Sequence, residues 1–155
     1  MGVSTAADAE AAFAGFVADV RPRLERAFTL LRGGEGGQEA TAEAFAWAWE
    51  HWDQVQEMAN PAGYLYRVGQ SRTRPRRQRV LFDRRYAEEP LVEPGLPDAL
   101  AALSPKQRVA VVLVHGFGMT LREVAEVTGL GVTTVQTHME RGLRRLRKAL
   151  GTDDV

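Results

Sequence analysis

The sequence predicts an all-α protein of two small helical domains. Apolar residues recur at steps of three and four along most of the 155 residues, which is the period of an α-helix, and the alternation typical of strands is nearly absent. Residues 88–97 contain three prolines, a glycine and three acids, a composition typical of a linker. We therefore expect one domain over residues 1–85, a linker over 86–97 and a second domain over 98–155.

The first domain should open with two long helices. An apolar stripe predicts a helix over residues 7–31, in which Pro22 should cause a kink or a break. Four glycines within residues 33–37 predict a turn, and a second amphipathic helix should follow over residues 38–52.

A third helix should carry the basic end of this domain. Residues 53–60 are expected to form a loop, after which Asn60 is a good N-cap and Pro61 a good first helical residue. The helix then becomes rich in arginine, and Pro75 should end or bend it.

The second domain should begin with two short helices. Asp98 is the expected N-cap of the first helix. Ser104 followed by Pro105 should start the next helix, which we expect to end near His115.

Residues 120–141 have the layout of a helix-turn-helix of the winged-helix-like kind. Thr120 and Glu123 predict a capping box before a short helix, and residues 129–131 predict a tight turn before a long helix. Such a second helix enters the major groove of DNA when small and polar side chains line its N-terminal face. The side chains expected to face DNA are Thr133, Thr134, Gln136, Thr137, His138, Arg141 and Arg145. An ordinary helical hairpin with a basic last helix is the alternative.

Formal charge is segregated along the chain, although the net charge is zero. Residues 1–66 hold four arginines against ten acids, and residues 67–85 hold eight arginines against one acid. Residues 86–105 have four acids and no base, and residues 106–150 have eight bases against three acids. The two basic blocks are candidate phosphate contacts, and an acidic block could meet a basic protein partner. Solvated helix faces would give the same pattern.

Catalysis and membrane insertion are not indicated. No apolar run approaches the roughly 18 residues of a membrane span, and no basic segment leads into an apolar one at the N-terminus, so we expect a cytoplasmic protein. Cysteine is absent, and His51, His115 and His138 lack partners at metal-ligand spacing. With no phosphate loop and no nucleophile–base pattern, we expect no catalytic residue, no metal and no cofactor.

Motifs in both halves resemble those of one family. In the first half they are Glu43-Ala44-Phe45, Ala48-Trp49 and Asn60-Pro61-Ala62-Gly63-Tyr64-Leu65-Tyr66-Arg67-Val68. In the second half they are Leu103-Ser104-Pro105, Thr120-Leu121-Arg122-Glu123-Val124-Ala125 and Arg141-Gly142-Leu143-Arg144-Arg145-Leu146. In this order, and joined by an acidic linker, they resemble regions two and four of the extracytoplasmic-function sigma factors over nearly the whole chain.

The resemblance implies protein partners. Region two of this family grips the clamp of the largest subunit of core RNA polymerase, and region four docks on the flap of the second-largest subunit, here through the helix over 105–115. An anti-sigma factor is a further expected partner. The residues that match the clamp contacts are Glu39, Glu43, Phe45, Trp49 and Trp52. The acids would pair with basic groups of the clamp, whereas the aromatic side chains would either anchor it or form core.

The resemblance also implies promoter DNA as a ligand. In the family, region two opens the minus-ten element and holds an extruded base, and region four binds the minus-thirty-five element. The residues that match the minus-ten contacts are Asn60, Tyr64, Arg67, Ser71, Arg72, Arg74, Arg76 and Arg77. The DNA-facing residues of the helix-turn-helix match the minus-thirty-five contacts.

Two other functions stay open. A stand-alone helix-turn-helix regulator would bind a palindromic operator as a dimer, without polymerase. A sigma-like protein could instead bind polymerase after losing promoter melting, because Ser71 stands where the family usually has Asn and Pro75 falls within the basic helical segment.

Overall fold

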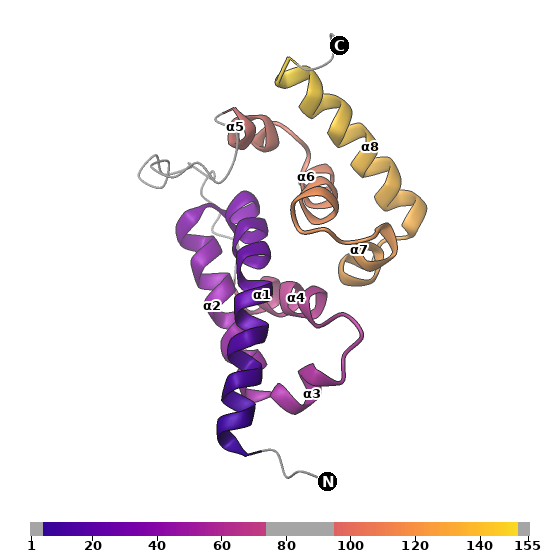
Figure 1. Cartoon of the computed structure of the whole chain (residues 1–155). Coiled ribbons are helices and arrows are strands. Elements are labelled where there is room, and N and C mark those ends of the chain that lie inside the picture. The colour runs from indigo at the N-terminus through magenta and orange to yellow at the C-terminus, as the bar shows by residue number, and fades with distance from the viewer. Residues whose placement is uncertain (1–4, 74–94, 152–155) are drawn as a thin grey trace.

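The computed structural model describes residues 5–73 and 95–151, and over these residues it is helical without a single strand (Figure 1). The helices of the first half are α1 (Ala6–Arg32), α2 (Gly34–Glu50), α3 (Trp52–Gln56) and α4 (Pro61–Arg72). Those of the second half are α5 (Leu96–Ala101), α6 (Pro105–Val111), the π-helix η2 (Val112–Gly116), α7 (Leu121–Thr128) and α8 (Val132–Ala149). The all-α prediction is confirmed, and within the described residues no β-wing accompanies the helix-turn-helix.

The first half is a bundle in which α4 packs on both α1 and α2. Its centre is Phe28, which is fully buried and whose ring stacks on Tyr66 with 5.3 Å between ring centroids. The helices approach closely where side chains are absent. A Cβ atom at Gly69 would lie 2.6 Å from Phe28 Cζ, and one at Gly37 would lie 2.7 Å from the backbone nitrogen of Thr29. Glycine at these two positions therefore sets how near α4 and α2 lie to α1.

The structure narrows one prediction for α1 and contradicts one for α2. Of the kink or break expected at Pro22, the break does not occur, since α1 runs through the proline as one helix. Val20 and Leu24 are both buried on either side of the proline, and this packing outweighs the lost hydrogen bond. The four-glycine turn shrinks to Gly33 alone, whose φ of 84° reverses the chain within one residue, so α2 begins at Gly34 rather than at residue 38.

The connection between α2 and α4 is more helical than predicted. The second helix ends at Glu50 instead of residue 52, and α3 occupies the first part of the predicted loop over 53–60. Asn60 caps α4 as expected, because its Oδ1 accepts from the backbone N–H of Gly63 at 3.1 Å. The helix ends at Arg72, and Pro75 lies outside the described residues.

In the second half, the caps predicted from side-chain chemistry are confirmed with one exception. Ser104 and Thr120 both form complete capping boxes, with Gln107 and Glu123 respectively. Gly95 rather than Asp98 caps α5, so this helix starts inside the predicted linker with Pro97 in its first turn. The predicted helix over 105–115 also changes character, because α6 passes into the π-helix η2 after Val111.

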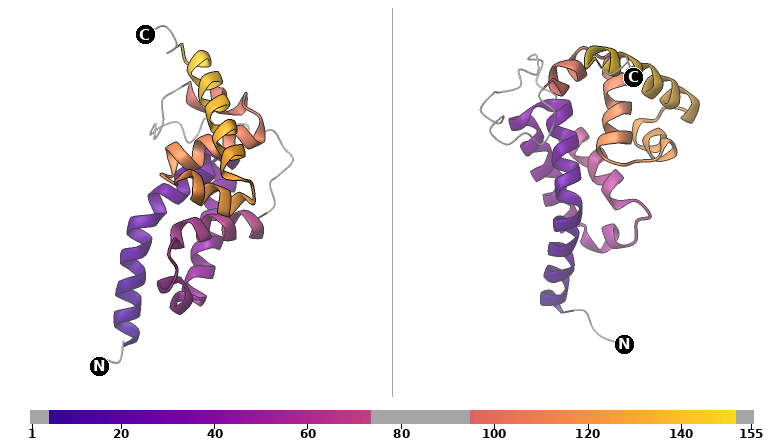
Figure 2. Two further views of the ribbon diagram at one scale, coloured as in Figure 1. Left: turned by 90° about the vertical axis from the view of Figure 1, so that its right-hand side faces the viewer. Right: turned by 45° about the horizontal axis from the view of Figure 1, so that its top comes forward.

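The two halves pack against each other and share one hydrophobic core. The π-helix η2 lies against α1, and α7 lies against α4. The Arg23 guanidinium carbon lies 5.6 Å from the ring centroid of Phe117, whose side chain is only 3% exposed. Figure 2 shows the second-half helices gathered along the C-terminal part of α1, beyond which the indigo N-terminal end projects. Buried residues of both halves form a single cluster.

Candidate nucleic-acid interface

The N-terminal part of α8 presents the polar surface that the sequence predicts. Thr133, Thr134 and Gln136 are exposed, whereas Val135 between them is 1% exposed and packs into the core. The hydroxyl of Thr137 donates to the Thr133 carbonyl oxygen at 3.0 Å, and Gln136 Nε2 donates to Glu140 Oε1 at 3.1 Å. These bonds fix the orientation of polar groups on a face that no described part of the chain covers. Thr137 and His138 are half-buried at its edge.

Close packing of α6 against α8 holds this face outward. A Cβ atom at Gly142 would lie 2.7 Å from Val111 Cγ2, so the two helices cross where α8 has no side chain. Arg108 of α6 donates to the carbonyl oxygens of Leu100 and Leu103, at 2.9 and 3.1 Å, and so ties α6 to the residues before it. Neither contact has a local signature in the sequence, because both depend on how the helices pack together.

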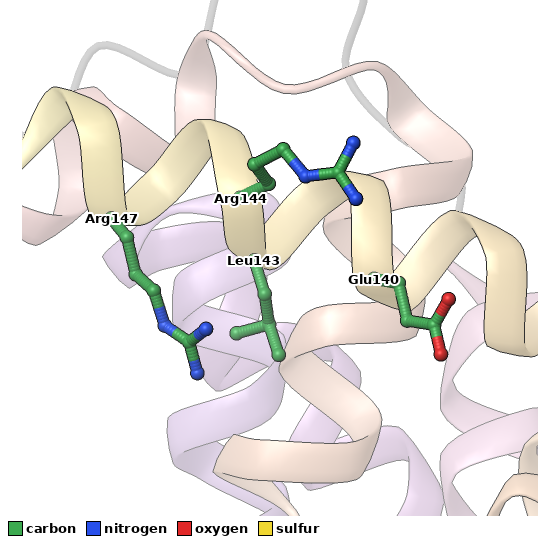
Figure 3. A pocket seen from close by; sticks show the side chains of 4 residues that line it. All are labelled: Glu140, Leu143, Arg144 and Arg147. Atoms are coloured by element: carbon green, nitrogen blue, oxygen red, sulfur yellow. The ribbon is translucent and has the colours of Figure 1, made fainter. Parts of the chain in front are cut away.

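The basic residues of α8 do not all have the same surroundings. Arg145 donates to Gln107 Oε1 and to the Ala102 carbonyl oxygen, both at 3.1 Å, and so connects α8 to α6 and to the residue that follows α5. Arg141 is exposed one turn nearer the helix N-terminus. Further along, Glu140, Leu143, Arg144 and Arg147 line a shallow hollow of about 240 Å³. Figure 3 shows Arg144 pointing away from Arg147 there, so the hollow does not gather both guanidinium groups at one point.

A pair of substitutions separates these roles. The sequence expects Arg141 at DNA, so Arg141→Ala should weaken binding to a minus-thirty-five duplex by about 1–3 kcal/mol. It should leave the thermal midpoint unchanged, because Arg141 is exposed and makes no hydrogen bond or ion pair within the described residues. Arg145→Ala should lower the free energy of unfolding by about 1 kcal/mol, because it removes two intramolecular hydrogen bonds. Fluorescence anisotropy with labelled duplex and thermal unfolding followed by circular dichroism measure the two effects. A stability loss confined to Arg141→Ala would contradict this assignment.

The exposed side of α4 forms a second polar surface. Tyr64, Arg67 and Ser71 are spaced by three and four residues, so they share one exposed face of the helix. Of the two tyrosines within α4, Tyr64 is the accessible one, at 39% exposed. Tyr66 is 1% exposed, and burial raises the pKa of its phenol to about 12. Tyr66 therefore belongs to the core and Tyr64 to the surface.

The two ends of α4 are fixed by different residues. Asn60 was predicted from the sequence, and Arg32 was not. Asn60 serves as the N-cap, so its Oδ1 is already bonded. At the other end, Arg32 of α1 donates to the carbonyl oxygens of Gln70 and Thr73, at 3.0 and 2.9 Å. A cation at a helix C-terminus also interacts favourably with the helix dipole. Arg32 thus positions α4, and a local pattern could not reveal this because the partners are far apart in sequence.

Two predicted sets of residues meet where α4 lies beside α2. Arg72, expected at the minus-ten element, approaches Glu43, expected at the polymerase clamp, with 3.9 Å between Nη1 and Oε2. Both side chains are about half exposed, at 46% and 48%, so this ion pair is weak. Three further arginines of the minus-ten set, Arg74, Arg76 and Arg77, lie outside the described residues.

The residues expected at the clamp lie on the surface of α2 and at its junction with α3. Glu39 and Glu43 are exposed. The aromatic members contact α1, since Phe45 lies 6.2 Å from Phe16 and Trp52 lies 5.3 Å from it, measured between ring centroids. Trp49 remains 47% exposed although it packs against Phe13 at 5.0 Å. The aromatic cluster is thus part core and part surface.

Residues 5–73 and 95–151 contain no group of three or more His, Cys, Asp or Glu side chains placed to hold a metal ion. None of the helices in these ranges is both long and apolar enough to cross a membrane.

Comparisons with known proteins match first the second half and then most of the chain. Residues 95–146 match the family model for sigma-70 region 4. The chain is 31% identical over 144 residues to the RNA polymerase sigma-E factor of Streptomyces coelicolor, an alignment that covers 85% of this chain and 81% of that protein. It is also 43% identical over 60 residues to the RNA polymerase sigma-E factor of Streptomyces antibioticus, which is 39% of this chain but only 33% of that protein's length.

Two solved structures share the fold over nearly the whole chain. The sigma factor RpoE in complex with the anti-sigma factor NepR from Bartonella quintana has a TM-score of 0.71 and 20% identity, with 92% of this chain and 98% of that chain covered. CnrH in complex with the cytosolic domain of CnrY has a TM-score of 0.68 and 23% identity, with 94% and 91% covered. Because the match extends over both halves, the arrangement of the halves is similar as well.

Proposed function

The chain belongs to the extracytoplasmic-function RNA polymerase sigma factors, which direct transcription initiation by RNA polymerase, and we propose how its two halves divide that work. The exposed N-terminal face of α8 binds the minus-thirty-five element as duplex. The exposed face of α4 binds the opened strand of the minus-ten element. The surface of α2 that carries Glu39 and Glu43 binds the polymerase clamp.

The polar face of α8 is the observation that carries this proposal. Val135, Gly142 and Leu146 of α8 are buried at spacings of seven and four residues, so they share one face and the remaining sides of the helix point outward. Threonine hydroxyls and a glutamine amide can donate to and accept from base edges in the major groove. The face is short and rigidly held, which is what direct recognition of a few base pairs requires.

The α4 surface suits a different form of DNA. An exposed tyrosine offers a ring on which an unpaired base stacks, and Arg67 one turn away offers a cation for the phosphate that follows. No acid occurs within α4, so the surface does not repel a phosphate backbone. A flat ring is of little use in recognising the edge of a paired base, and this favours a single strand as the ligand.

The remaining parts of the proposal concern partners and location. The similar proteins RpoE and CnrH were solved with an anti-sigma factor and with the cytosolic domain of CnrY, and we assign this chain an anti-sigma partner of its own. Its place of action is the cytoplasm, together with polymerase and DNA. The chain itself performs no catalysis, and the chemistry belongs to the polymerase.

Run-off transcription with purified core polymerase on a library of genomic fragments tests the proposal. We expect initiation only when the chain is added, from start sites that share two sequence elements at one spacing. Permanganate should then modify unpaired thymines in the downstream element. Tight binding to a palindromic duplex without polymerase, and no initiation, would instead identify a stand-alone regulator. Polymerase-dependent binding without reactive thymines would identify a sigma-like protein that no longer melts DNA.

A further inference from the structure

Three aromatic side chains lie together where the end of α2 meets the start of α4. The Trp47 and His51 rings stack almost parallel, with 4.3 Å between centroids and 13° between planes. Trp47 also contacts the ring of Tyr64 across the two helices, at 5.2 Å. We call these three residues the aromatic surface. The clamp and promoter contacts that the family resemblance implies include only Tyr64.

Hydrogen bonding holds this surface in one orientation. His51 Nδ1 lies 2.9 Å from the Trp47 carbonyl oxygen, and because a carbonyl can only accept, Nδ1 carries the proton. The imidazole is thereby fixed against the indole and supports it from one side. Trp47 and His51 are half-buried and Tyr64 is 39% exposed, so the rings are partly open to solvent rather than enclosed in core.

The charges around the aromatic surface favour an anionic ligand on the α4 side. Arg67 is exposed on the same face of α4 as Tyr64. Further along, Arg72 meets Glu43, which is one turn before Trp47 on α2. The acid next to the group is Glu50, which is exposed and adjacent to His51 in sequence. Carboxylate charge therefore lies along α2, and on the exposed stripe of α4 Arg67 has no carboxylate partner among the described residues.

We propose that Trp47, supported by His51, stacks on an unpaired base of single-stranded promoter DNA next to the one held at Tyr64. The inference rests on the proposed function, because it takes the exposed face of α4 to follow the opened minus-ten strand. A nucleotide combines a flat apolar base with a phosphate, and this surface combines rings with Arg67 on the same exposed face of α4 as Tyr64. The rings are held before DNA arrives, so little conformational freedom is lost when a base stacks.

Two substitutions at Trp47 separate stacking from packing. Trp47→Phe keeps an aromatic face, and Trp47→Leu keeps apolar bulk without one. With holoenzyme, Trp47→Leu should reduce open-complex formation on a duplex promoter by about 5- to 150-fold, the loss typical of removing one base–aromatic stack. Trp47→Phe should retain most of the activity. Glu50→Ala, which changes the same helix outside the aromatic surface, serves as the control that should stay near wild type.

The readout is 2-aminopurine fluorescence from probes placed one at a time along the minus-ten strand, together with run-off transcription. One probe position should lose its quenching in Trp47→Leu and keep it in Trp47→Phe. Circular dichroism of each variant establishes that it folds. If both variants initiate and quench like wild type while wild type itself opens the promoter, the aromatic surface does not bind a base. If wild type does not initiate at all, the proposed function fails before this inference is reached.

Discussion

Replacing Phe28 by alanine is expected to lower the free energy of unfolding by about 3–5 kcal/mol. Phe28 is fully buried, stacks on Tyr66 of α4 and lies under the Arg32 guanidinium, whose carbon is 5.8 Å from its ring centroid. Truncation leaves a cavity where α1 and α4 meet and also removes support from the arginine that binds the end of α4. Urea unfolding followed by circular dichroism measures the loss, and promoter opening should fall with it.

Phe28→Leu is the matched control for this change. It keeps most of the buried volume, so it should cost less than about 1.5 kcal/mol. A loss below about 1 kcal/mol for Phe28→Ala would mean that α4 is not held by this ring, and the position of the α4 surface would then need another explanation.

Replacing Gly142 by valine is expected to separate α8 from α6 and abolish binding to the minus-thirty-five duplex. Even the Cβ atom would lie 2.7 Å from Val111 Cγ2 and 3.3 Å from the Gln107 carbonyl oxygen. Overpacking of this kind costs about 1–3 kcal/mol or more, and the shift of α8 moves every side chain that faces DNA. Unfolding by urea and anisotropy with labelled duplex measure the two effects.

The chain supplies both a control and a partial rescue for this variant. Gly15 lies inside α1 with open space around its Cβ position, so Gly15→Val should change stability by less than about 0.5 kcal/mol. Adding Val111→Ala to Gly142→Val should recover part of the lost stability, because the nearest clashing atom is removed. Two results would contradict this prediction. One is an equal loss of stability in Gly142→Val and Gly15→Val, and the other is no recovery of stability when Val111→Ala is added to Gly142→Val. Either would show that close contact between α6 and α8 does not determine the stability of this region.

The parts of the fold that could be predicted from the sequence are those set by near neighbours. Asn60, Ser104 and Thr120 cap helices through groups three residues away, and the chemistry of such caps is visible in any short stretch of sequence. The polar face of α8 follows in the same way from helical periodicity. Local periodicity also located the candidate DNA surface of α8, whereas the candidate surface of α4 was expected from the family resemblance.

The parts that could not be predicted depend on which helices meet. Arg32 and Arg145 each bond to residues 38 or more positions away, and neither partner has a signature of its own. Pro22 was expected to kink or break α1 because intrinsic propensity counts only the lost hydrogen bond, whereas burial of Val20 and Leu24 keeps α1 one continuous helix. The same limitation applies to Trp47, whose ring contact with Tyr64 exists only because α2 and α4 pack together.

The shared core has a thermodynamic consequence for the whole chain. Leu30 of α1 is 7% exposed, and Phe117, which directly follows η2, is 3% exposed. Both lie where the two halves meet. Separating η2 from α1 would therefore transfer apolar area to water at about 25 cal/mol per Å². Each half therefore owes part of its thermal stability to contacts with the other half. A destabilising substitution in one half should lower the melting temperature of both. Cleavage of the peptide chain between residues 74 and 94 would then leave two fragments that still associate.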